Sequence, residues 1–339
     1  MSFSQPIGLL PAAVKRLSED SVEVRWNPKA SHLEISVCRG DSPDTILLDS
    51  PLVRVKQKSS VMLSGLPIDH PHFFKLIAGD GNAVIIGERR LFIEGAPNLR
   101  DLGGYETADG RRVKWGRIFR SGNLGRLTDR GLGQIKRLGI RTACDFRTEA
   151  EALKLPNRFP DSLDVAYIRL SIQHGDYEPT TAFNRIRQGD YDWISEDFMI
   201  QGYIESVECY PEVWARLFQL LSDARRRPLI FHCTGGKDRT GAAAALILLS
   251  LGVPTETVVA DYGLSDDYNV DMRKTIYDHL RPLGVDVVKV DPYFTAPESR
   301  IRALLGYIND HYGSAVGYLV KKAGVSEEMI AHLQDDLLE

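Results

Sequence analysis

The sequence predicts an α/β domain with a mainly parallel central sheet, preceded by a small all-β sandwich. Short runs that alternate apolar and polar residues fill positions 1–95. From residue 96 onward, strand-like and helix-like segments alternate instead. One of those strands, at residues 228–231, leads through a tight loop into an alanine- and leucine-rich helix at 242–249. We therefore expect two domains, 1–95 and 96–339.

The first domain is predicted to hold seven or so short strands. The runs that suggest strands are residues 22–26, 33–37, 45–48, 53–55, 61–63, 73–78, 83–86 and 90–93. Asp80, Gly81 and Asn82 form a sequence typical of a turn between two of them. With Trp26 in an early strand and aromatic residues in a late one, this region resembles a fibronectin type III or immunoglobulin-like domain. We expect it to be a scaffold or docking module without a catalytic role.

The second domain is predicted from helix signals that separate apolar strands. Thr128 is a plausible N-cap for a helix over 129–138, which Gly139 would end. Strands are expected at 117–120, 140–146 and 165–170, and helices from residue 149 and over 205–223. This alternation implies a mainly parallel sheet, in which ligands bind at the carboxyl ends of the strands.

The loop at residues 233–241 carries the chemistry. Cys233 and Arg239 are separated by five residues that include Gly235 and Gly236. Such a loop can curl so that its N–H groups meet at one centre beside a helix N-terminus, which makes a nest for a tetrahedral dianion. The cysteine would then be a nucleophile, and the arginine a two-pronged donor to phosphate oxygens. This is the chemistry of cysteine-dependent phosphatases.

Other interpretations of this loop fit less well. A nucleotide-binding phosphate loop would need glycine where Phe231 stands, and serine or threonine after Lys237, where Asp238 stands. A metal site from His232 and Cys233 lacks a second pair of ligands at a familiar spacing. A buried structural cysteine is the remaining alternative, which the glycines and the flanking strand and helix disfavour. We therefore expect no metal and no cofactor.

Composition fits a soluble enzyme. The 339 residues are 43% hydrophobic, which is enough for two cores, and the net charge of −4 gives no basis for expecting nucleic-acid binding. No transmembrane segment and no secretory signal is visible, so a cytoplasmic location is expected, although export without such a signal stays open. The four cysteines show no paired spacing, which suits a reducing compartment. They are Cys38, Cys144, Cys209 and Cys233.

Five motifs in a fixed order give a resemblance to a known family. They are residues 96–105, 119–121, 138–142, 145–148 and 232–241, with weaker similarity at 261–265 and 307–325. Together they resemble the bacterial tyrosine/serine protein phosphatases, which are atypical cysteine phosphatases, some of which also accept phosphoinositides. The resemblance covers about residues 96–339. It implies the three-layer α/β sandwich of the protein-tyrosine phosphatases.

The resemblance also implies roles for the loop residues. Cys233 would attack phosphorus and form a cysteinyl phosphate, which water then hydrolyses. Arg239 and the loop N–H groups would stabilise the phosphoryl oxygens. Thr240 would either donate to the cysteine sulfur or serve as an ordinary helix-terminal hydroxyl, and His232 would order the loop. The substrate-binding residues would be Thr234, Gly235, Gly236, Lys237, Asp238 and Arg239.

Two aspartates are candidates for the general acid that protonates the leaving group. Asp238 lies inside the loop, as in the resembling family. Asp145 ends a predicted strand in the sequence Asp-Phe-Arg, where it could equally form an ion pair with Arg147. The Trp-Pro-Asp sequence of classical tyrosine phosphatases does not occur. We place Asp238 first and Asp145 second.

Three further features bear on the substrate and its access. Lys237 adds a second cation to the loop, which suits a polyanion such as a phosphoinositide. In residues 98–104, Arg100 and Asp101 are expected to pin the loop. Residues 266–297 are either a lid, as in some relatives, or ordinary packed helices.

The leading hypothesis is a phosphomonoesterase that acts on phosphotyrosine, with phosphoserine, phosphothreonine or phosphoinositides as broader substrates. Its partner is then a phosphorylated protein or a phosphoinositide, and the sequence does not predict an oligomeric state. A pseudophosphatase that only captures phosphorylated ligands is the alternative, which the intact Cys233 and Arg239 disfavour. Sulfur transfer on a rhodanese-like loop is a third class, disfavoured by the motifs at 98–104 and 261–265.

Overall fold

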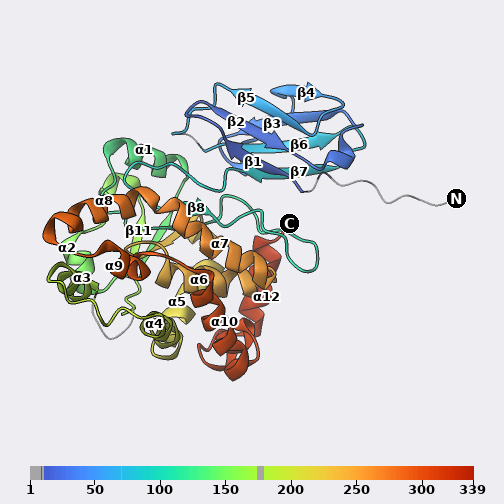
Figure 1. Ribbon diagram of the computed structural model, residues 1–339. Coiled ribbons are helices and arrows are strands. Elements are labelled where there is room, and N and C mark those ends of the chain that lie inside the picture. Colours follow the sequence, from blue (N-terminus) through green and yellow to red (C-terminus); the bar gives the residue numbers. More distant parts are fainter. Residues whose placement is uncertain (1–8, 10, 70, 174–178) are drawn as a thin grey trace. The chain divides into compact units, whose positions relative to one another are not determined.

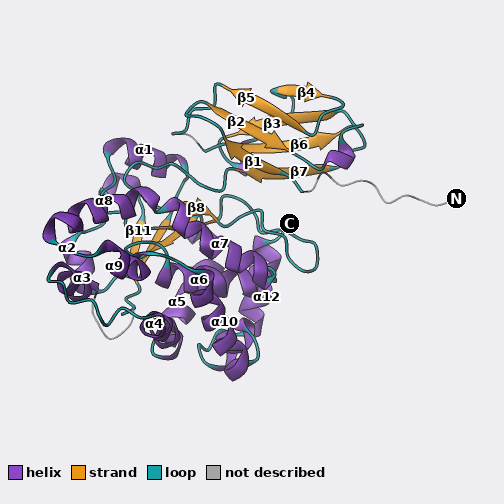
Figure 2. Cartoon of the chain, viewed as in Figure 1, coloured by secondary structure: helices purple, strands orange, loops and turns teal. Residues whose placement is uncertain are grey.

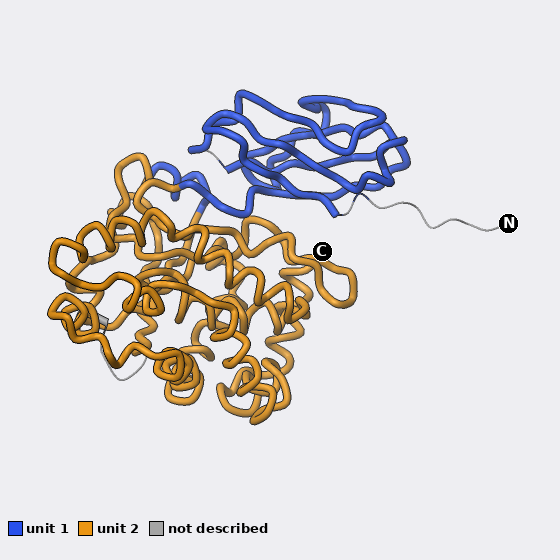
Figure 3. Tube along the Cα trace, in the orientation of Figure 1, with its two compact units in different colours: residues 1–92, 133–139 blue, residues 93–132, 140–339 orange. Residues whose placement is uncertain are grey.

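A computed structural model describes residues 9, 11–69, 71–173 and 179–339. The first eight residues, where no secretory signal is predicted, lie outside the described part. Contacts divide the chain into two compact units, which are residues 1–92 with 133–139, and residues 93–132 with 140–339 (Figure 3). Within the described residues, every helix is too short or too polar to cross a membrane.

The N-terminal unit contains two antiparallel sheets (Figure 2). One has the order β1 (Ala13–Arg16), β2 (Ser21–Arg25), β5 (Ser60–Ser64), and the other the order β4 (Val53–Val55), β3 (Ile35–Gly40), β6 (Phe73–Ala78), β7 (Ala83–Gly87). Their inward side chains form one apolar cluster that includes Trp26, Val37 and Phe74. The expected all-β sandwich is therefore confirmed.

Two of the strands predicted in this unit are wrong, and one is missed. Of residues 45–48, Thr45 ends a 3-10 turn, Pro43–Thr45, and Leu47 and Leu48 are exposed, so their alternation marks no buried face. Residues 90–93 belong to the irregular passage after β7. The missed strand is β1, whose four residues include two charged ones and give too short a pattern to recognise.

The C-terminal unit is built on a five-stranded sheet (Figure 1). Its order is β11 (Ala166–Arg169), β10 (Thr142–Asp145), β12 (Leu229–His232), β9 (Ile118–Ser121), β8 (Arg100–Asp101). The first four strands are parallel, and β8 runs antiparallel to β9. His232 at the end of β12 pairs with Asp145 on one side and Ser121 on the other. Three strand ends therefore meet where the loop begins.

Both faces of this sheet are covered. Every residue of β9, β10 and β12 is buried, and successive side chains of a strand point to opposite faces. The helices are α1 (Asp129–Arg137), α2 (Glu149–Lys154), α3 (Pro179–Arg187), α4 (Glu196–Glu208), α5 (Pro211–Ser222), α6 (Asp238–Ser250), α7 (Thr255–Tyr268), α8 (Val270–Leu280), α9 (Val287–Phe294), α10 (Glu298–Tyr312), α11 (Ala315–Lys321) and α12 (Glu327–Leu337). The predicted α/β sandwich with a mainly parallel sheet is confirmed.

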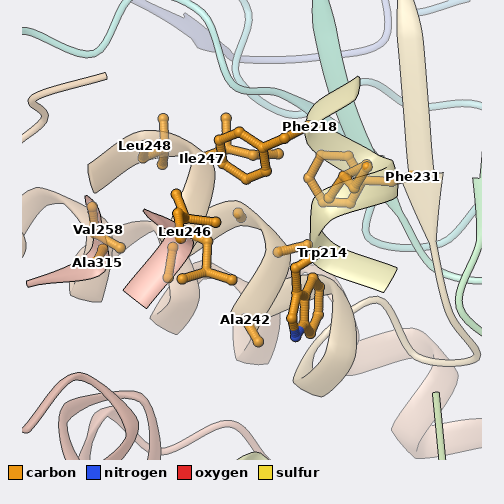
Figure 4. Close-up of a cluster of buried hydrophobic side chains, with 14 of the residues drawn as sticks. Trp214, Phe218, Phe231, Ala242, Leu246, Ile247, Leu248, Val258 and Ala315 are labelled. Carbon is orange, nitrogen blue, oxygen red and sulfur yellow. The ribbon is translucent and has the colours of Figure 1, made fainter. Parts of the chain in front are cut away.

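Helix α6 lies inside this core. Its residues from 239 to 248 are all buried, which explains why residues 242–249 are apolar on every side of the helix rather than along one stripe. Figure 4 shows Leu246 and Ile247 among the side chains packed with Phe231 of β12 and Trp214 of α5. A helix held on all sides fixes the position of its own N-terminus, where the loop ends.

The helix predicted over residues 205–223 is instead two helices, α4 and α5. Pro211 is the first residue of α5. Proline lacks the N–H that would continue the helix before it, and its ring favours a helix start. The polar stretch before residue 205, for which no element is predicted, holds α3 and most of α4.

Candidate active site

Residues 233–237 form the loop that joins β12 to α6. Cys233 stands directly after the strand and is 2% exposed. Gly236 has a φ of +68°, and a Cβ atom there would lie 2.5 Å from the backbone of Ser121 and Gly122. Glycine is therefore required at this position for two reasons, the left-handed conformation and the close approach of the end of β9.

The carbonyl groups of this loop are held from outside. Asn98 donates from Nδ2 to the oxygens of Gly235 (3.1 Å) and Gly236 (2.9 Å). Arg120 Nη2 donates to the Gly236 oxygen at 3.0 Å, and Asn269 Nδ2 to the Gly235 oxygen at 3.0 Å. These contacts fix the orientation of the peptide groups between the glycines.

The N–H groups of the same peptides have no such partners. In the part of the chain that the structure describes, those of Gly235, Gly236 and Lys237 donate to no protein acceptor. Backbone N–H groups without protein acceptors next to a helix N-terminus, here that of α6, are the kind of donors that anion-binding nests use. These free donors agree with the predicted nest, and anion binding by them stays a prediction.

Buried ion pairs support the residues that hold the loop. Asp261 accepts from Arg100 Nε (3.0 Å), Arg120 Nη1 (2.6 Å) and the Tyr105 hydroxyl (2.8 Å). Arg100 also donates to Asn98. Of the residues expected to pin the loop, Arg100 therefore acts through Asp261 and Asn98.

Asn98 and Asp101 differ from the expectation for this motif. Asn98, which contacts the loop directly, was not singled out, although its φ of +58° is one that asparagine tolerates better than most residues. Asp101 accepts from the N–H groups of Gly103 (2.7 Å) and Gly116 (2.6 Å), so it orders the turn after β8.

Arg239 is held by a carboxylate that sequence reasoning missed. Its Nη1 and Nη2 atoms donate to Glu151 at 2.6 and 2.9 Å, and Nη1 also donates to the carbonyl oxygens of Phe146 and Ile172. Burial opposes the charge of Glu151, but Arg239 and Thr234 outweigh it and lower its pKa to about 2. The pair is therefore ionised and fixes the plane of the guanidinium group.

The sequence around Glu151 carries a recognisable motif, but one that indicates a helix start and not a contact with Arg239. Thr148 and Glu151 form a capping box at the start of α2, in which each side chain accepts from the other's backbone. The spacing identifies the start of a helix, and only the fold shows that the same carboxylate also accepts from Arg239 and from the Thr234 hydroxyl.

Asp238, the first candidate for the general acid, is the first residue of α6. Its Oδ1 atom accepts from the Tyr203 hydroxyl at 2.6 Å and from Lys237 Nζ at 3.0 Å. Lys237 also donates to the Thr295 carbonyl oxygen at 3.1 Å, and burial lowers its pKa.

Asp145, the second candidate, lies in a buried ion pair. It accepts from Arg147 Nη2 at 2.7 Å and from the Tyr167 hydroxyl at 3.0 Å. Burial raises the pKa of Asp145, but His232 and Arg147 lower it by more, so the net shift is downward. This geometry corresponds to the ion-pair interpretation of the Asp-Phe-Arg sequence.

His232 and Thr240 flank the loop residues in the sequence. His232 is fully buried, which lowers its pKa to about 4, so its ring is neutral. Its Nδ1 donates to the Cys233 oxygen at 3.2 Å, and Nε2 accepts from Asn157 at 2.9 Å. The Thr240 hydroxyl is buried and has no hydrogen-bond partner among the described residues.

Both ends of the segment expected as a lid contact the loop. Asn269, just before α8, binds Gly235, and Thr295, just after α9, binds Lys237. The helices between them, α8 and α9, pack with α3. Their apolar side chains, with Ile186 and Leu280 among them, form a cluster separate from the main core. Movement of this segment stays a prediction.

A cysteine directly after a strand, a loop with N–H groups that lack protein acceptors among the described residues, and an arginine held by a carboxylate are features typical of the cysteine-dependent phosphatases. The sequence model of the tyrosine phosphatase family matches residues 91–339. The chain belongs to this family, and the family predicted from its motifs is confirmed.

Several relatives share most of this region. A Cupriavidus necator chain, provisionally named a tyrosine-protein phosphatase, is 30% identical over 237 residues, which cover 70% of this chain and 85% of that relative. The triple specificity protein phosphatase PtpB of Mycobacterium tuberculosis is 30% identical over 275 residues, 73% of this chain and 98% of its own. A tyrosine-protein phosphatase of Nostoc commune is 28% identical over 226 residues, 64% and 72% of the two chains.

Among solved structures, the core catalytic domain of the PP-IP phosphatase SIW14 from S. cerevisiae superposes on 51% of this chain and 78% of that domain. The TM-score is 0.31 and the identity 12%, a superposition too partial to bear on function.

Proposed function

We propose that this protein hydrolyses the phosphomonoester of phosphotyrosine in proteins, through a cysteinyl-phosphate intermediate. The observation that carries the proposal is the loop itself. Cys233 begins it, the N–H groups of residues 235–237 donate to no protein acceptor among the described residues, and Glu151 holds Arg239 in place. The proposed phosphate-binding residues are those from 234 to 239. Because one relative is named a triple specificity phosphatase, the proposal includes phosphoserine and phosphothreonine as slower substrates.

The proposed first step transfers the phosphoryl group to sulfur. The Cys233 thiolate attacks phosphorus, the bond from phosphorus to the tyrosyl oxygen breaks, and the protonated Asp238 gives that oxygen its proton. Arg239 and the loop N–H groups take the charge that spreads over the other phosphoryl oxygens.

The proposed second step returns the enzyme to its starting state. Water attacks phosphorus, its proton passes to the Asp238 carboxylate, and the sulfur–phosphorus bond breaks to release phosphate and the thiolate. The Thr240 hydroxyl is proposed to donate to that sulfur, since a buried hydroxyl without a partner is costly unless it finds one.

Asp238 is preferred to Asp145 as the proton donor. Asp238 belongs to the first turn of the helix behind the phosphate loop, whereas Asp145 is buried in its pair with Arg147. The neutral, hydrogen-bonded His232 is proposed to order the loop rather than to transfer protons.

A phosphoinositide is the second candidate substrate. The observation that favours it is Lys237, whose ammonium group lies between Asp238 and the Thr295 carbonyl and adds a cation beside Arg239. A multiply phosphorylated ring would use both cations, whereas phosphotyrosine needs only one.

The wider setting is proposed on less specific grounds. The four cysteines are all free, which supports a reducing compartment such as the cytoplasm. Residues 1–95 and 96–339 are proposed as the two domains, with the β-sandwich as a scaffold or docking module.

The test compares p-nitrophenyl phosphate, phenyl phosphate, a phosphotyrosine peptide and phosphatidylinositol phosphates, with reductant and without added metal. We expect turnover of the peptide, its loss in Cys233→Ser, and little change in Asp145→Glu. In Asp238→Asn we expect a larger loss with phenyl phosphate than with p-nitrophenyl phosphate, because p-nitrophenolate leaves without a proton. Turnover that survives Cys233→Ser would overturn the mechanism, and a faster rate with lipid would make the phosphoinositide the preferred substrate.

A further inference from the structure

Asp238 is contacted by a pair of tyrosine hydroxyls that the loop motif does not include. Tyr203 of α4 donates to Asp238 Oδ1 at 2.6 Å, and the Tyr262 hydroxyl of α7 lies 2.5 Å from that of Tyr203. Both side chains are fully buried. Since Tyr203 gives its single proton to the carboxylate, the proton between the two hydroxyls must come from Tyr262.

The last glycine of the motif makes room for this arrangement. A Cβ atom on Gly241 would lie 2.8 Å from Cδ2 of Tyr262. Gly241 is in α6, where glycine is unfavourable by about 1 kcal/mol relative to alanine. The absent side chain lets the Tyr262 ring lie against the first turn of the helix that carries Asp238.

We propose that Tyr203 and Tyr262 are positioning residues, which hold Asp238 Oδ1 and keep the carboxylate ionised until substrate arrives. The proposal rests on the proposed role of Asp238 as the general acid. It adds that Asp238 gains its proton when a bound phosphate offsets the surrounding positive charge, and that the chain of two hydroxyls, called the relay below, sets this balance.

The groups that the structure shows in hydrogen-bond contact with Asp238 Oδ1 are donors, which bind an ionised carboxylate better than a neutral one. Lys237 from the loop donates to the same oxygen. Arg239 of α6 and Arg300 of α10 also interact with Asp238, while each pairs with a carboxylate, Glu151 and Glu196. Burial and the nearby carboxylate raise the pKa of both tyrosines, so their hydroxyls stay protonated and remain donors. A phosphate dianion that enters the loop offsets these cations and raises the proton affinity of Asp238. Asp238 is then protonated when substrate is bound, so it can donate a proton to the leaving group.

Removing one hydroxyl tests the relay. In Tyr203→Phe the ring remains but the donor is lost, so the alkaline limb of kcat/KM for phenyl phosphate should move to higher pH, by about one unit. Tyr262→Phe should shift it less, in the same direction. The double variant should shift it no further than Tyr203→Phe alone, because Tyr262 acts only through Tyr203. Additive shifts, or no shift, would overturn the relay.

The matched control is a tyrosine–carboxylate contact elsewhere. Tyr312 donates to Glu208 at 2.6 Å, so Tyr312→Phe removes a similar bond and should leave the pH profile unchanged. An equal shift in this variant would mean that the effect is general rather than specific to the relay.

A readout that needs no turnover separates this proposal from the proposed function. In the Cys233→Ser protein, carboxyl-carbon NMR can follow the Asp238 titration, identified by the signal lost in Asp238→Asn. Tyr203→Phe should raise the pKa of Asp238 in this titration by about one unit. If it does so while the wild type turns over no phosphomonoester, the relay stands and the proposed function fails. If Tyr203→Phe folds and the pKa of Asp238 does not change, the relay is overturned. If Tyr203→Phe does not fold, the same measurement is made on Tyr262→Phe.

Discussion

The β-sandwich and the α/β unit both contain buried ion pairs. The pair in the sandwich connects only parts of the sandwich to one another. Arg16 of β1 donates to Glu88 at 2.8 Å and to the Leu66 carbonyl, so it joins β1 to the residue after β7 of the other sheet and to the segment after β5. In the α/β unit the pairs of Arg239 with Glu151, and of Arg120 with Asp261, extend to groups of the phosphate loop.

This difference shows that burial of an ion pair does not by itself identify a functional site. An ion pair whose members contact only the structure around them contributes, at most, to the specificity of the fold, because the cost of desolvating the two charges offsets much of their attraction. A pair whose members also bind loop groups sets the position of the atoms that contact phosphate. Substitutions in the first kind should change stability alone, and substitutions in the second should change turnover.

The largest loss is expected from Gly236→Ala. The added methyl group would lie 2.5 Å from the backbone at Ser121 and Gly122, and the residue would keep a positive φ. To relieve this clash the loop must move away from β9, which disorders its N–H donors. We expect kcat/KM for a phosphotyrosine peptide to fall by at least about 10²-fold, the effect of one lost oxyanion donor.

The neighbouring glycine supplies the comparison for this variant. A Cβ atom on Gly235 would meet its nearest neighbours, Lys237 and Met272, at 3.8 Å, an ordinary contact. Gly235→Ala should therefore lose far less activity than Gly236→Ala. Equal losses would show that the loop is sensitive to any side chain, and not to the approach of β9.

Glu151→Gln should have the next largest effect. Glutamine has one acceptor oxygen and no charge, so it cannot accept from both Nη1 and Nη2 of Arg239. The guanidinium group then stays buried without a charged partner and loses its fixed orientation. We expect kcat to fall about 10²-fold, as for a displaced catalytic group. The unfolding free energy should also fall by roughly 3–5 kcal/mol, as when one member of a buried pair is removed. Steady-state kinetics and chemical denaturation measure the two effects on the same protein.

Glu88→Gln is the equivalent change in the sandwich. It removes the partner of Arg16 and should lower the thermal stability of the sandwich while kcat/KM stays within experimental error of the wild type. A drop in kcat/KM in the folded protein would contradict the separation of the two kinds of ion pair.

What the sequence predicts well in this chain is what depends on local pattern. The strand–loop–helix around Cys233, the N-cap at Thr128 and most strands follow from spacing and from turn residues. Glu151 and Asn98 were missed for a different reason. Each lies far along the chain from the loop that it contacts. The pairing of β8, β9 and β12 brings Asn98 to the loop, and the pairing of β10 with β12 brings Glu151 there.

The smallest expected effect concerns pH and compares one histidine from each unit. Burial lowers the pKa of His72 in the sandwich to about 4, as it does for His232. Each ring is neutral when folded and takes up a proton near pH 6.5 when unfolded. The stability that it contributes is therefore complete above pH 6.5 and is lost as the pH falls towards 4, on the order of 3 kcal/mol for each.

These two losses can be separated because they act on different units. His72 accepts from Arg39 Nε and donates to the Pro67 oxygen, and a glutamine can make similar bonds without titrating. His72→Gln should make the sandwich less sensitive to acid, while activity between pH 6.5 and 4.5 declines as in the wild type. Hydrogen exchange followed by mass spectrometry would report each unit by its own peptides. If the substitution protected the α/β peptides as well, the two units would unfold as one, and the contrast between them would hold for chemistry but not for stability.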